Sequence, residues 1–292
     1  MEPIKEPTPL VLVTSSPHMH CGLTIGKSMR EVMLALVPAI IASVYYFRMS
    51  AAIVMVTCVV SAIVFETICN KVMHKPNTVQ DGSAALTGLL LAMCLPASMP
   101  PLFAAMGSMF AIVVGKAVFG GLGCNIFNPA HIGRAILLAS FPQQMTNWVL
   151  PATAAASDAV STATPLAVMR ATEKIWQAGG AASAAKLPDL MNLFWGNVGG
   201  SLGETCVPAL VLGGLYLIYK KLIDWRIPVF YLVTVAILTG VYGAVMGYPS
   251  TFPLYHLFAG GLMIGAFFMA TDWVTSPITK KGKIIYAIGW VS

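Results

Sequence analysis

The sequence predicts an all-α protein that crosses a membrane several times. Of its 292 residues, 57% are hydrophobic and only 10% are charged, against about 25% charged residues in ordinary soluble domains. The mean hydropathy is +0.79, and one spanning helix needs roughly 20 apolar residues. We therefore expect one polytopic membrane domain, and we interpret the net charge of +6 as a topology signal rather than as a nucleic-acid-binding surface.

Apolar stretches separated by short polar segments predict the individual crossings. Continuous stretches run through 32–47, 51–69, 207–219 and 227–247, and shorter or interrupted ones through 83–97, 102–118, 130–141 and 254–270. The last apolar stretch, 284–292, is too short to span a bilayer. We expect the natural chain to continue to a tenth helix.

The basic residues predict the orientation. If the N-terminus is cytoplasmic and every stretch crosses once, only Arg48, Arg170, Lys174 and Lys186 lie outside. The thirteen that lie inside are Lys5, Lys27, Arg30, Lys71, Lys75, Lys116, Arg134, Lys220, Lys221, Arg226, Lys280, Lys281 and Lys283. Because cytoplasmic loops are enriched in Lys and Arg, this bias predicts a cytoplasmic N-terminus.

The same topology divides the chain into four parts. We expect a cytoplasmic segment at 1–30, a first transmembrane repeat at 31–142, an extracytoplasmic segment at 143–206 and a second, incomplete repeat at 207–292. Five crossings per half invert the second half relative to the first, and 86–93 faintly echoes 259–266. Glycine- or proline-interrupted segments at matching positions are typical of inverted-repeat transport folds. We therefore predict two inverted five-helix repeats with broken or short helices.

Two features exclude other classes. The polar start of the chain lacks the basic and apolar regions of a cleavable signal peptide. The six cysteines show no CxxC spacing and lie mostly within or beside apolar stretches, so we interpret them as packing residues rather than as a disulfide framework or a zinc site.

One run in the segment 143–206 carries a chemical signature. Residues 158–164 read Asp-Ala-Val-Ser-Thr-Ala-Thr, with the pattern Asp-x-x-Ser-x-Ala-Thr. Two interpretations stay open on composition alone: a loop rich in Ser, Thr and Ala, or a flavinylation motif whose last Thr or Ser carries FMN through a phosphoester bond.

Further motifs accompany this run: Gly-Gly-Leu-Gly-Cys-Asn-Ile-Phe-Asn-Pro-Ala at 120–130, Asp-Gly-Ser at 81–83 and Phe-Met-Ala-Thr-Asp at 268–272. With these motifs the chain resembles, over essentially its whole length, the family of the Rnf complex D subunit. The B subunit of the sodium-pumping NADH:quinone oxidoreductase is a related member with a longer N-terminal extension, so the short start favours the Rnf type.

The resemblance implies a cofactor and its attachment. FMN would be bound covalently at Thr164 by a transferase that acts outside the cytoplasmic membrane and takes FMN from FAD. Asp158 and Ser161 would present the hydroxyl or position the phosphate. The family also suggests a noncovalent riboflavin as a second flavin.

The resemblance further implies a role in a complex. The chain would belong to an ion-translocating ferredoxin:NAD oxidoreductase in a bacterial or archaeal cytoplasmic (inner) membrane, and it would be inactive alone. It would work with the A, B, C, E and G subunits of the Rnf complex, and ferredoxin and NAD would bind to these partners while Na⁺ or H⁺ is translocated. No iron–sulfur or nicotinamide motif occurs in the chain.

The run 120–130 has two interpretations of equal weight. Glycines let backbone amides approach a ligand closely, and Asn125 and Asn128 can donate and accept hydrogen bonds. The alternative is a tight turn in which Asn128 and Pro129 begin the next helix.

Ionisable residues beside apolar stretches are candidates for an ion pathway, because each is costly in lipid. Glu66 lies near the inner end of the second crossing, where snorkelling to the interface is the simpler interpretation. Asp81 and Asp272 fall at comparable inner ends of repeat-related helices, where helix capping explains them as readily. His131 and His256 have no metal-ligand spacing and are interpreted as packing residues, and no catalytic residue or metal ligand is predicted.

Two functions from other classes stay open. An inverted five-helix plan would also serve a channel or a transporter for a small solute without a flavin. The chain could instead be an anchoring subunit that holds partner proteins together and carries no cofactor.

Overall fold

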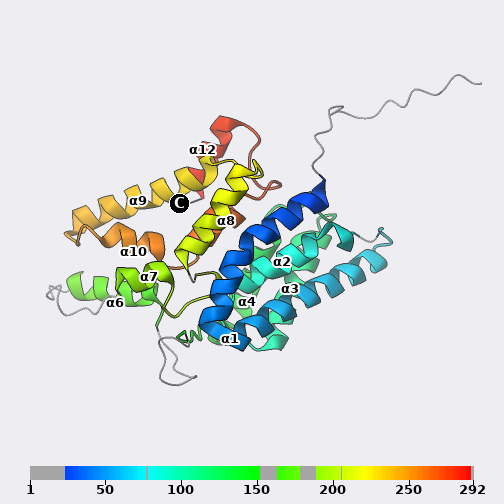
Figure 1. Ribbon diagram of the computed structural model, residues 1–292, viewed down its shortest axis with the longest axis horizontal. Coiled ribbons are helices and arrows are strands. Elements are labelled where there is room, and N and C mark those ends of the chain that lie inside the picture. Colours follow the sequence, from blue (N-terminus) through cyan, green and yellow to red (C-terminus); the bar gives the residue numbers. More distant parts are fainter. Residues whose placement is uncertain (1–23, 77, 152–162, 178–188, 205, 291–292) are drawn as a thin grey trace, which may run out of the picture.

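The computed structural model describes residues 24–76, 78–151, 163–177, 189–204 and 206–290. Regular structure in this part of the chain is helical, which confirms the predicted all-α class (Figure 1). The α-helices are α1 (Ile25–Val72), α2 (Ser83–Met93), α3 (Pro101–Ile112), α4 (Pro129–Ser140), α5 (Pro142–Met145), α6 (Pro165–Gln177), α7 (Leu190–Trp195), α8 (Val207–Tyr219), α9 (Arg226–Met246), α10 (Phe252–Phe258), α11 (Leu262–Ile264) and α12 (Lys280–Gly289). Four shorter turns join them: the 3-10 turns η1 (Val79–Asp81) and η4 (Leu202–Glu204) and the π turns η2 (Val113–Ala117) and η5 (Gly265–Met269).

Helix α1 is long enough to cross a bilayer twice. A straight helix of its 48 residues would be roughly 70 Å long at 1.5 Å per residue, more than twice the roughly 30 Å core of a bilayer. Arg48 breaks it with φ 52° and ψ −133°, and the chain folds back on itself there as a helical hairpin (Figure 1). The predicted crossings 32–47 and 51–69 are the two arms of this hairpin.

Two non-helical breaks interrupt the apolar stretches. Helix α2 ends at Met93, and the chain reaches Pro101 before α3 begins. In the second half, α10 and the segment Leu262–Met269 are bent by 65° across a short break. The predicted interruptions are therefore confirmed.

The echo between 86–93 and 259–266 does not align the two breaks. Residues 86–93 are helical throughout, whereas 259–261 form the break that precedes α11. The inverted repeat itself stays a prediction.

Hydrogen bonds between connecting segments define two ends of the helical bundle. At the basic end, which comprises the residues around Ile25 and the segments 73–76, 78–82, 118–128, 220–225 and 273–279, Lys75 Nζ donates to Gly120 O (2.6 Å) and Trp273 Nε1 donates to Leu222 O (2.6 Å). At the opposite end, which comprises Arg48, 94–100, 141–151, 163–177, 189–199 and 247–251, Ser98 Oγ donates to Asn147 O (2.5 Å). The segments assigned to one side by the basic-residue count thus meet at one end.

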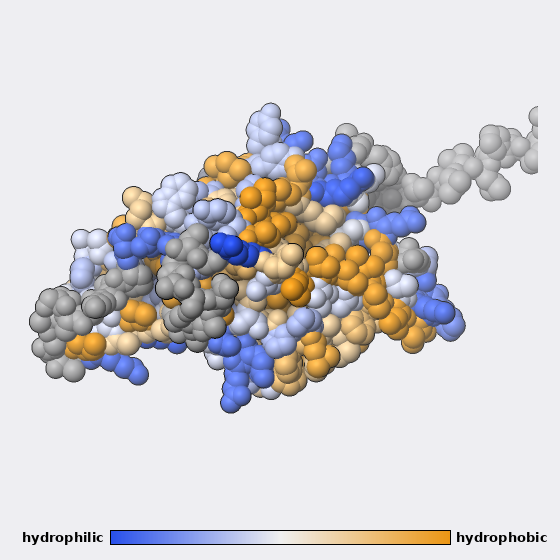
Figure 2. All heavy atoms as spheres, turned by 60° about the horizontal axis from the view of Figure 1, so that its bottom comes forward, coloured by the Kyte–Doolittle hydropathy of each residue, from blue (hydrophilic) through white to orange (hydrophobic). Residues whose placement is uncertain are grey.

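The outer surface is apolar, as a lipid-facing surface requires. Large hydrophobic side chains reach the surface on the helix faces, including Ile41 (63% exposed) on α1 and Val245 (77%) on α9, and they form broad patches in Figure 2. Among the residues that the structure describes, two helices, α1 and α9, are long and apolar enough to span a bilayer, and the bent pair α10 and Leu262–Met269 adds a third candidate. Helices α2, α3 with η2, and α8 are shorter apolar helices. The chain is a multi-pass membrane protein.

Glycines allow α2 and α8 to pack closely against α1. A Cβ at Gly88 of α2 would lie 2.5 Å from Cys58 O and 2.9 Å from Val59 Cα on α1. A Cβ at Gly213 of α8 would overlap Ala35 O, also on α1. In both cases the neighbour is backbone that cannot rotate away. Helix α1 therefore contacts α2 of the first half and α8 of the second half at positions where only glycine fits.

We predict that Gly88→Ala destabilises the purified protein by about 1–3 kcal/mol, the usual cost of overpacking a filled interior. Gly240→Ala on α9 is the matched control, because its Cβ would meet only Pro253 Cγ at 3.7 Å. Thermal unfolding in detergent, followed by tryptophan fluorescence, measures both. Equal melting temperatures for the two variants would contradict the close contact between α1 and α2.

Candidate functional site

A cavity of about 560 Å³ opens at the basic end between the two halves of the chain. Its volume lies within the roughly 300–1,000 Å³ that is typical of small-molecule and cofactor sites. Much of the wall is apolar, with Leu90, Ile112 and Phe268 among its side chains. The polar part of the wall includes Glu66, Asn70, Lys75, Thr78, Asp81, Ser83, Lys116, Asn125, Asn128, Thr271 and Asp272.

This cavity brings together five residues that the sequence singled out separately. Glu66, Asp81, Asn125, Asn128 and Asp272 all line it, although they come from four different segments of the chain. Their grouping makes the cavity the candidate site at the basic end.

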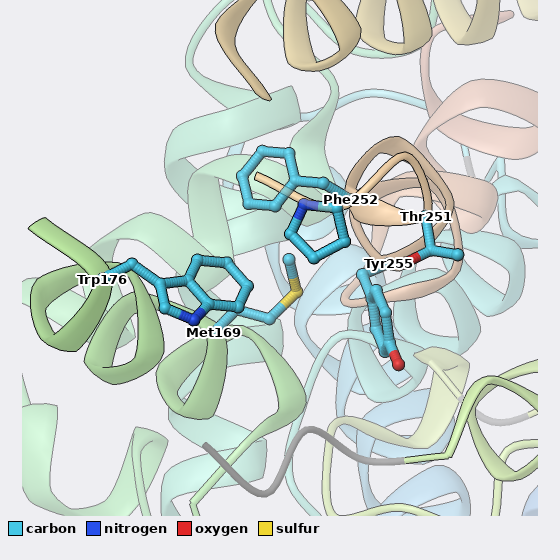
Figure 3. Close-up of a pocket in the computed structure, with 6 residues that line it drawn as sticks. Met169, Trp176, Thr251, Phe252 and Tyr255 are labelled. Atoms are coloured by element: carbon cyan, nitrogen blue, oxygen red, sulfur yellow. The ribbon is translucent and has the colours of Figure 1, made fainter. Parts of the chain in front are cut away.

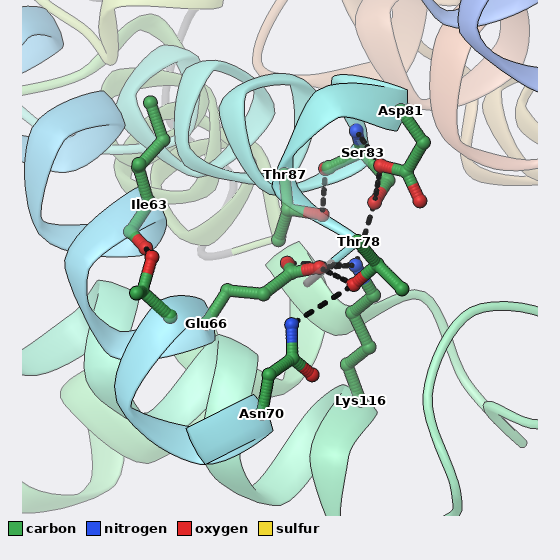
Figure 4. Close-up of polar contacts among 9 residues, drawn as sticks. Ile63, Glu66, Asn70, Thr78, Asp81, Ser83, Thr87 and Lys116 are labelled. Atoms are coloured by element: carbon green, nitrogen blue, oxygen red, sulfur yellow. Dashed lines mark hydrogen bonds and ion pairs between the residues drawn. The ribbon is translucent and has the colours of Figure 1, made fainter. Parts of the chain in front are cut away.

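A buried ion pair forms one wall of the cavity (Figure 4). Lys116 Nζ lies 2.8 Å from Glu66 Oε1 and 2.7 Å from Oε2, and it donates a third hydrogen bond to Ser83 Oγ at 2.6 Å. The two charged side chains are only 5% and 4% exposed. A pair so deeply buried is stable only with close geometry and further hydrogen bonds, because both charges have lost their water.

Further polar side chains extend the pair in both directions (Figure 4). Thr78 Oγ1 donates to Glu66 Oε1 (2.8 Å), and Asn70 Nδ2 donates to Thr78 Oγ1 (3.0 Å). On the other side, Ser83 Oγ donates to Asp81 Oδ1 (2.5 Å). The network therefore joins the second arm of α1, the η1 turn and the start of α2 to Lys116.

Lys116 lies on a π turn. Val118 N donates to Val113 O (3.0 Å), a bond five residues apart, and the turn η2 widens the helix where Lys116 points toward Glu66. A second π turn, η5, places Phe268 on the cavity wall from the other half. Such turns occur frequently at functional sites.

One interpretation of these charges is corrected by the structure. Glu66 does not snorkel to the interface; it is buried at 3% exposure because Lys116 neutralises it within the bundle. Lys116 and Arg134 belong to helical segments rather than to the connecting loops. Lys116 faces Glu66, and Arg134 Nη1 lies 3.9 Å from the position of a Cβ on Gly261, at the break before α11. The one sequence signal for Lys116 is its place inside the apolar stretch 102–118.

Asp81 and Asp272 have different partners. Asp81 Oδ1 accepts from Ser83 N (2.8 Å) and so caps the start of α2, as the capping interpretation predicted. Asp272, just beyond η5, accepts from Asn125 Nδ2 at 3.4 Å, a contact that joins the two halves. Burial raises the pKa of Asp272, and the hydrogen bonds that it accepts only partly offset that effect.

The glycine run is both a turn and part of the cavity wall. Gly120, Gly121 and Gly123 have φ of 120°, 113° and 92°, a region that favours glycine. A Cβ on Gly121 or Gly123 would meet no atom within 4 Å, so bare backbone faces open space beside the cavity. Asn128 Oδ1 then accepts from Ala130 N (3.0 Å) and caps α4, as the turn interpretation predicted.

Thr164 lies elsewhere, at the opposite end of the bundle. Its Oγ1 accepts a hydrogen bond from Ala167 N (3.2 Å), so the hydroxyl occupies the N-terminus of α6. The side chain of Thr164 is partly exposed. Asp158 and Ser161 lie outside the described residues.

Aromatic packing holds α6 against α10. Met169 and Trp176 of α6 face Thr251, Phe252 and Tyr255 across a pocket of about 10 Å³ (Figure 3), which has room for no more than roughly one water molecule. This pocket is too small for a ring system. It is a packing contact that fixes the position of α6.

The two histidines pack against rings. The rings of His131 and Trp290 have centroids 5.7 Å apart, and those of His256 and Phe252 lie 4.6 Å apart. His256 Nε2 also lies 3.9 Å from Glu173 Oε1 of α6. Within the part of the chain that the structure describes, no group of three His, Cys, Asp or Glu side chains is placed to hold a metal ion.

Comparison with known proteins identifies relatives over nearly the whole chain. The model of the NQR2, RnfD, RnfE family matches residues 12–291. The chain is 49% identical over 280 residues to the D subunit of the proton-translocating ferredoxin:NAD(+) oxidoreductase complex of Clostridium ljungdahlii, and the match covers 95% of this chain and 83% of the relative.

Other relatives carry similar names. The D subunit of the Na(+)-translocating ferredoxin:NAD(+) oxidoreductase complex of Acetobacterium woodii is 44% identical over 95% of this chain and 81% of its own length. The D subunit of the ion-translocating oxidoreductase complex of Rhodobacter capsulatus is 40% identical over 94% of this chain and 82% of its own length.

The ion pair predicts a non-additive effect of substitution. Glu66→Gln or Lys116→Met alone is expected to destabilise the protein by about 3 kcal/mol, because each leaves a buried charge without its partner. The double variant is expected to be more stable than the sum of the single effects predicts. Thermal unfolding of the four proteins measures the coupling, and purely additive losses would contradict it.

Proposed function

The chain belongs to the NQR2, RnfD, RnfE family, and from that premise we propose that it is a membrane flavoprotein subunit of an Rnf-type electron-transport complex. The complex would couple electron flow between ferredoxin and NAD to ion translocation. The relative at 49% identity is named for proton translocation and the one at 44% identity for Na⁺ translocation. The translocated ion in this proposal is therefore H⁺ or Na⁺.

FMN bound covalently at Thr164 is the first part of this proposal. A phosphoester needs a hydroxyl that a transferase can reach, and Thr164 is partly exposed at the opposite end of the bundle. Its position at the start of the 13-residue helix α6 favours a bound phosphate, because unpaired amides and the helix dipole attract anions there. The residues present therefore fit the group, and this position is the observation that carries the proposal.

A noncovalent flavin in the cavity is the second part. The volume of about 560 Å³, the apolar wall, the bare backbone at Gly121 and Gly123 and the amide of Asn125 suit a flat ring with polar edges. Three acidic and two basic side chains line the cavity. That balance disfavours a phosphate, which supports riboflavin rather than a second FMN.

A flavin supplies one-electron chemistry when bound; the side chains here would hold and orient it and balance its charge. Thr164 would anchor one flavin at the opposite end, and Asn125 and Asn128 would help to hold the other at the basic end. Glu66, Asp81 and Asp272 form the ion pathway. Ferredoxin and NAD would bind to the partner A, B, C, E and G subunits, and a flavin transferase would mature Thr164.

The orientation follows from the charges. We place the basic end in the cytoplasm and residues 143–206 on the outer side of a bacterial or archaeal cytoplasmic membrane, because Lys and Arg accumulate on the cytoplasmic side. Removing Lys116 and Arg134 from the count leaves the bias intact.

Thr164→Val is expected to abolish covalent flavin in protein made with the transferase. The denatured, gel-resolved variant should show no ultraviolet-excited flavin band, and electron transfer by the assembled complex should fall. Thr164→Ser is the control, since it keeps a hydroxyl and should keep the band. A band that survives in the Val variant would contradict attachment at this residue and favour a channel or an anchoring role.

Asn125→Leu is expected to lower the amount of noncovalent flavin released from the denatured complex by at least half, because it removes the amide that faces the cavity. The covalent band at Thr164 should be unaffected. Cys124→Ser, at an exposed neighbouring position, is the control. Equal release from all three proteins would argue against this cavity as the second flavin site.

A further inference from the structure

We propose that the ammonium group of Lys116 is a tethered substitute for a metal cation, and that Glu66 binds a free alkali-metal cation such as Na⁺ when Lys116 leaves it. This inference rests on the ion translocation proposed above. Lys116 is not among the site residues that the sequence predicts.

The surroundings of Lys116 Nζ are those of a bound cation. Three oxygens surround it: Glu66 Oε1 at 2.8 Å, Glu66 Oε2 at 2.7 Å and Ser83 Oγ at 2.6 Å. Hard metal cations also bind carboxylate, hydroxyl and water oxygens. Thr78 Oγ1 donates to Glu66 from the other side and so holds the carboxylate in place while its partner changes.

Glu66 requires a positive partner. It is 3% exposed, and an unpaired carboxylate in a bilayer-embedded bundle is strongly unfavourable. If Lys116 withdraws, another cation must replace it. The cavity beside Glu66 opens at the basic end, so solvent cations have a route to the carboxylate.

The Lys116 ammonium can move away from Glu66, because the cavity lies beside it and a second carboxylate is near. Its flexible four-carbon stem starts from the π turn η2, on the wall of the cavity. Asp81 lies one hydrogen bond beyond Ser83, because Ser83 Oγ accepts from Lys116 and donates to Asp81 Oδ1. The acidic groups facing the cavity outnumber the basic ones, so the ammonium exchanges one carboxylate for another.

Negative charge in the cavity drives the exchange. One electron passed from reduced ferredoxin, which is thereby oxidised, to the flavin proposed for the cavity would add one negative charge there, and Lys116 would move toward that charge. Glu66 then takes up one cation from the basic end, and the charge added is balanced. Because buried charges interact far more strongly than charges in water, electron arrival and cation uptake become coupled.

Cation-dependent stability tests this assignment. The assembled complex carrying Lys116→Met leaves Glu66 without its ammonium, and NaCl should raise its melting temperature by about 2–4 °C relative to choline chloride at equal ionic strength. The wild-type complex should show no such difference, because Lys116 occupies the site. The double variant Glu66→Gln with Lys116→Met should lose the response.

Lys116→Gln is a second variant, to be used if the Met variant does not assemble, since its amide can still donate to Ser83. A Lys116 variant as indifferent to NaCl as the wild type would overturn the assignment, and so would a double variant that responds equally. The flavin band at Thr164 is read on the same samples. Its loss would count against the proposed cofactor and leave the cation result unaffected.

Discussion

The ion pair between Lys116 and Glu66 is the interaction on which the candidate site depends. Charged side chains inside a bilayer-embedded bundle are stable only when they find partners within the protein. Here the partners come from α1, the start of α2 and the π turn η2, so one buried pair fixes the relative positions of three segments. Those three segments form a wall of the cavity. The pairing of these buried charges therefore also determines the shape of the site.

The helix breaks follow the same constraint. Backbone groups freed at a break need hydrogen-bond partners, because lipid supplies none. Near the break after α2, Leu202 N donates to Leu95 O (3.0 Å) and Ser43 Oγ donates to Leu202 O (2.6 Å). The segment around Leu202, which enters the bundle between the two halves, thus supplies a hydrogen-bond partner for the backbone after α2. Non-helical backbone is tolerated there because it is buried in protein. Breaks that are satisfied in this way let polar groups and bare glycine backbone line an interior cavity.

Much of the fold could be predicted from the sequence, because hydropathy reports directly on burial in lipid. The stretch 207–219 is the whole of α8, and 227–247 differs from α9 by one residue at each end. The residues of the site could be predicted individually, but their grouping could not. Glu66, Asp81, Asn125, Asn128 and Asp272 were recognisable as polar residues out of place, but nothing local indicates that they share one cavity.

The role of Lys116 could not be predicted from the sequence. In the sequence it is a basic residue near the end of an apolar stretch, and its charge favours the cytoplasmic side. Its real role depends on a π turn and on a carboxylate fifty residues earlier. Pairing across distant segments is a property of the folded bundle.

Thr164 and the cavity lie at opposite ends of the bundle, and this separation is what a membrane protein that moves electrons between flavins would need. The central claim is that the hydroxyl of Thr164 carries FMN. Mass spectrometry of the peptide that contains Thr164, from protein matured with a competent transferase, measures this directly. The account predicts a mass increase equal to FMN minus water on that residue. An unmodified Thr164 in such protein would contradict it.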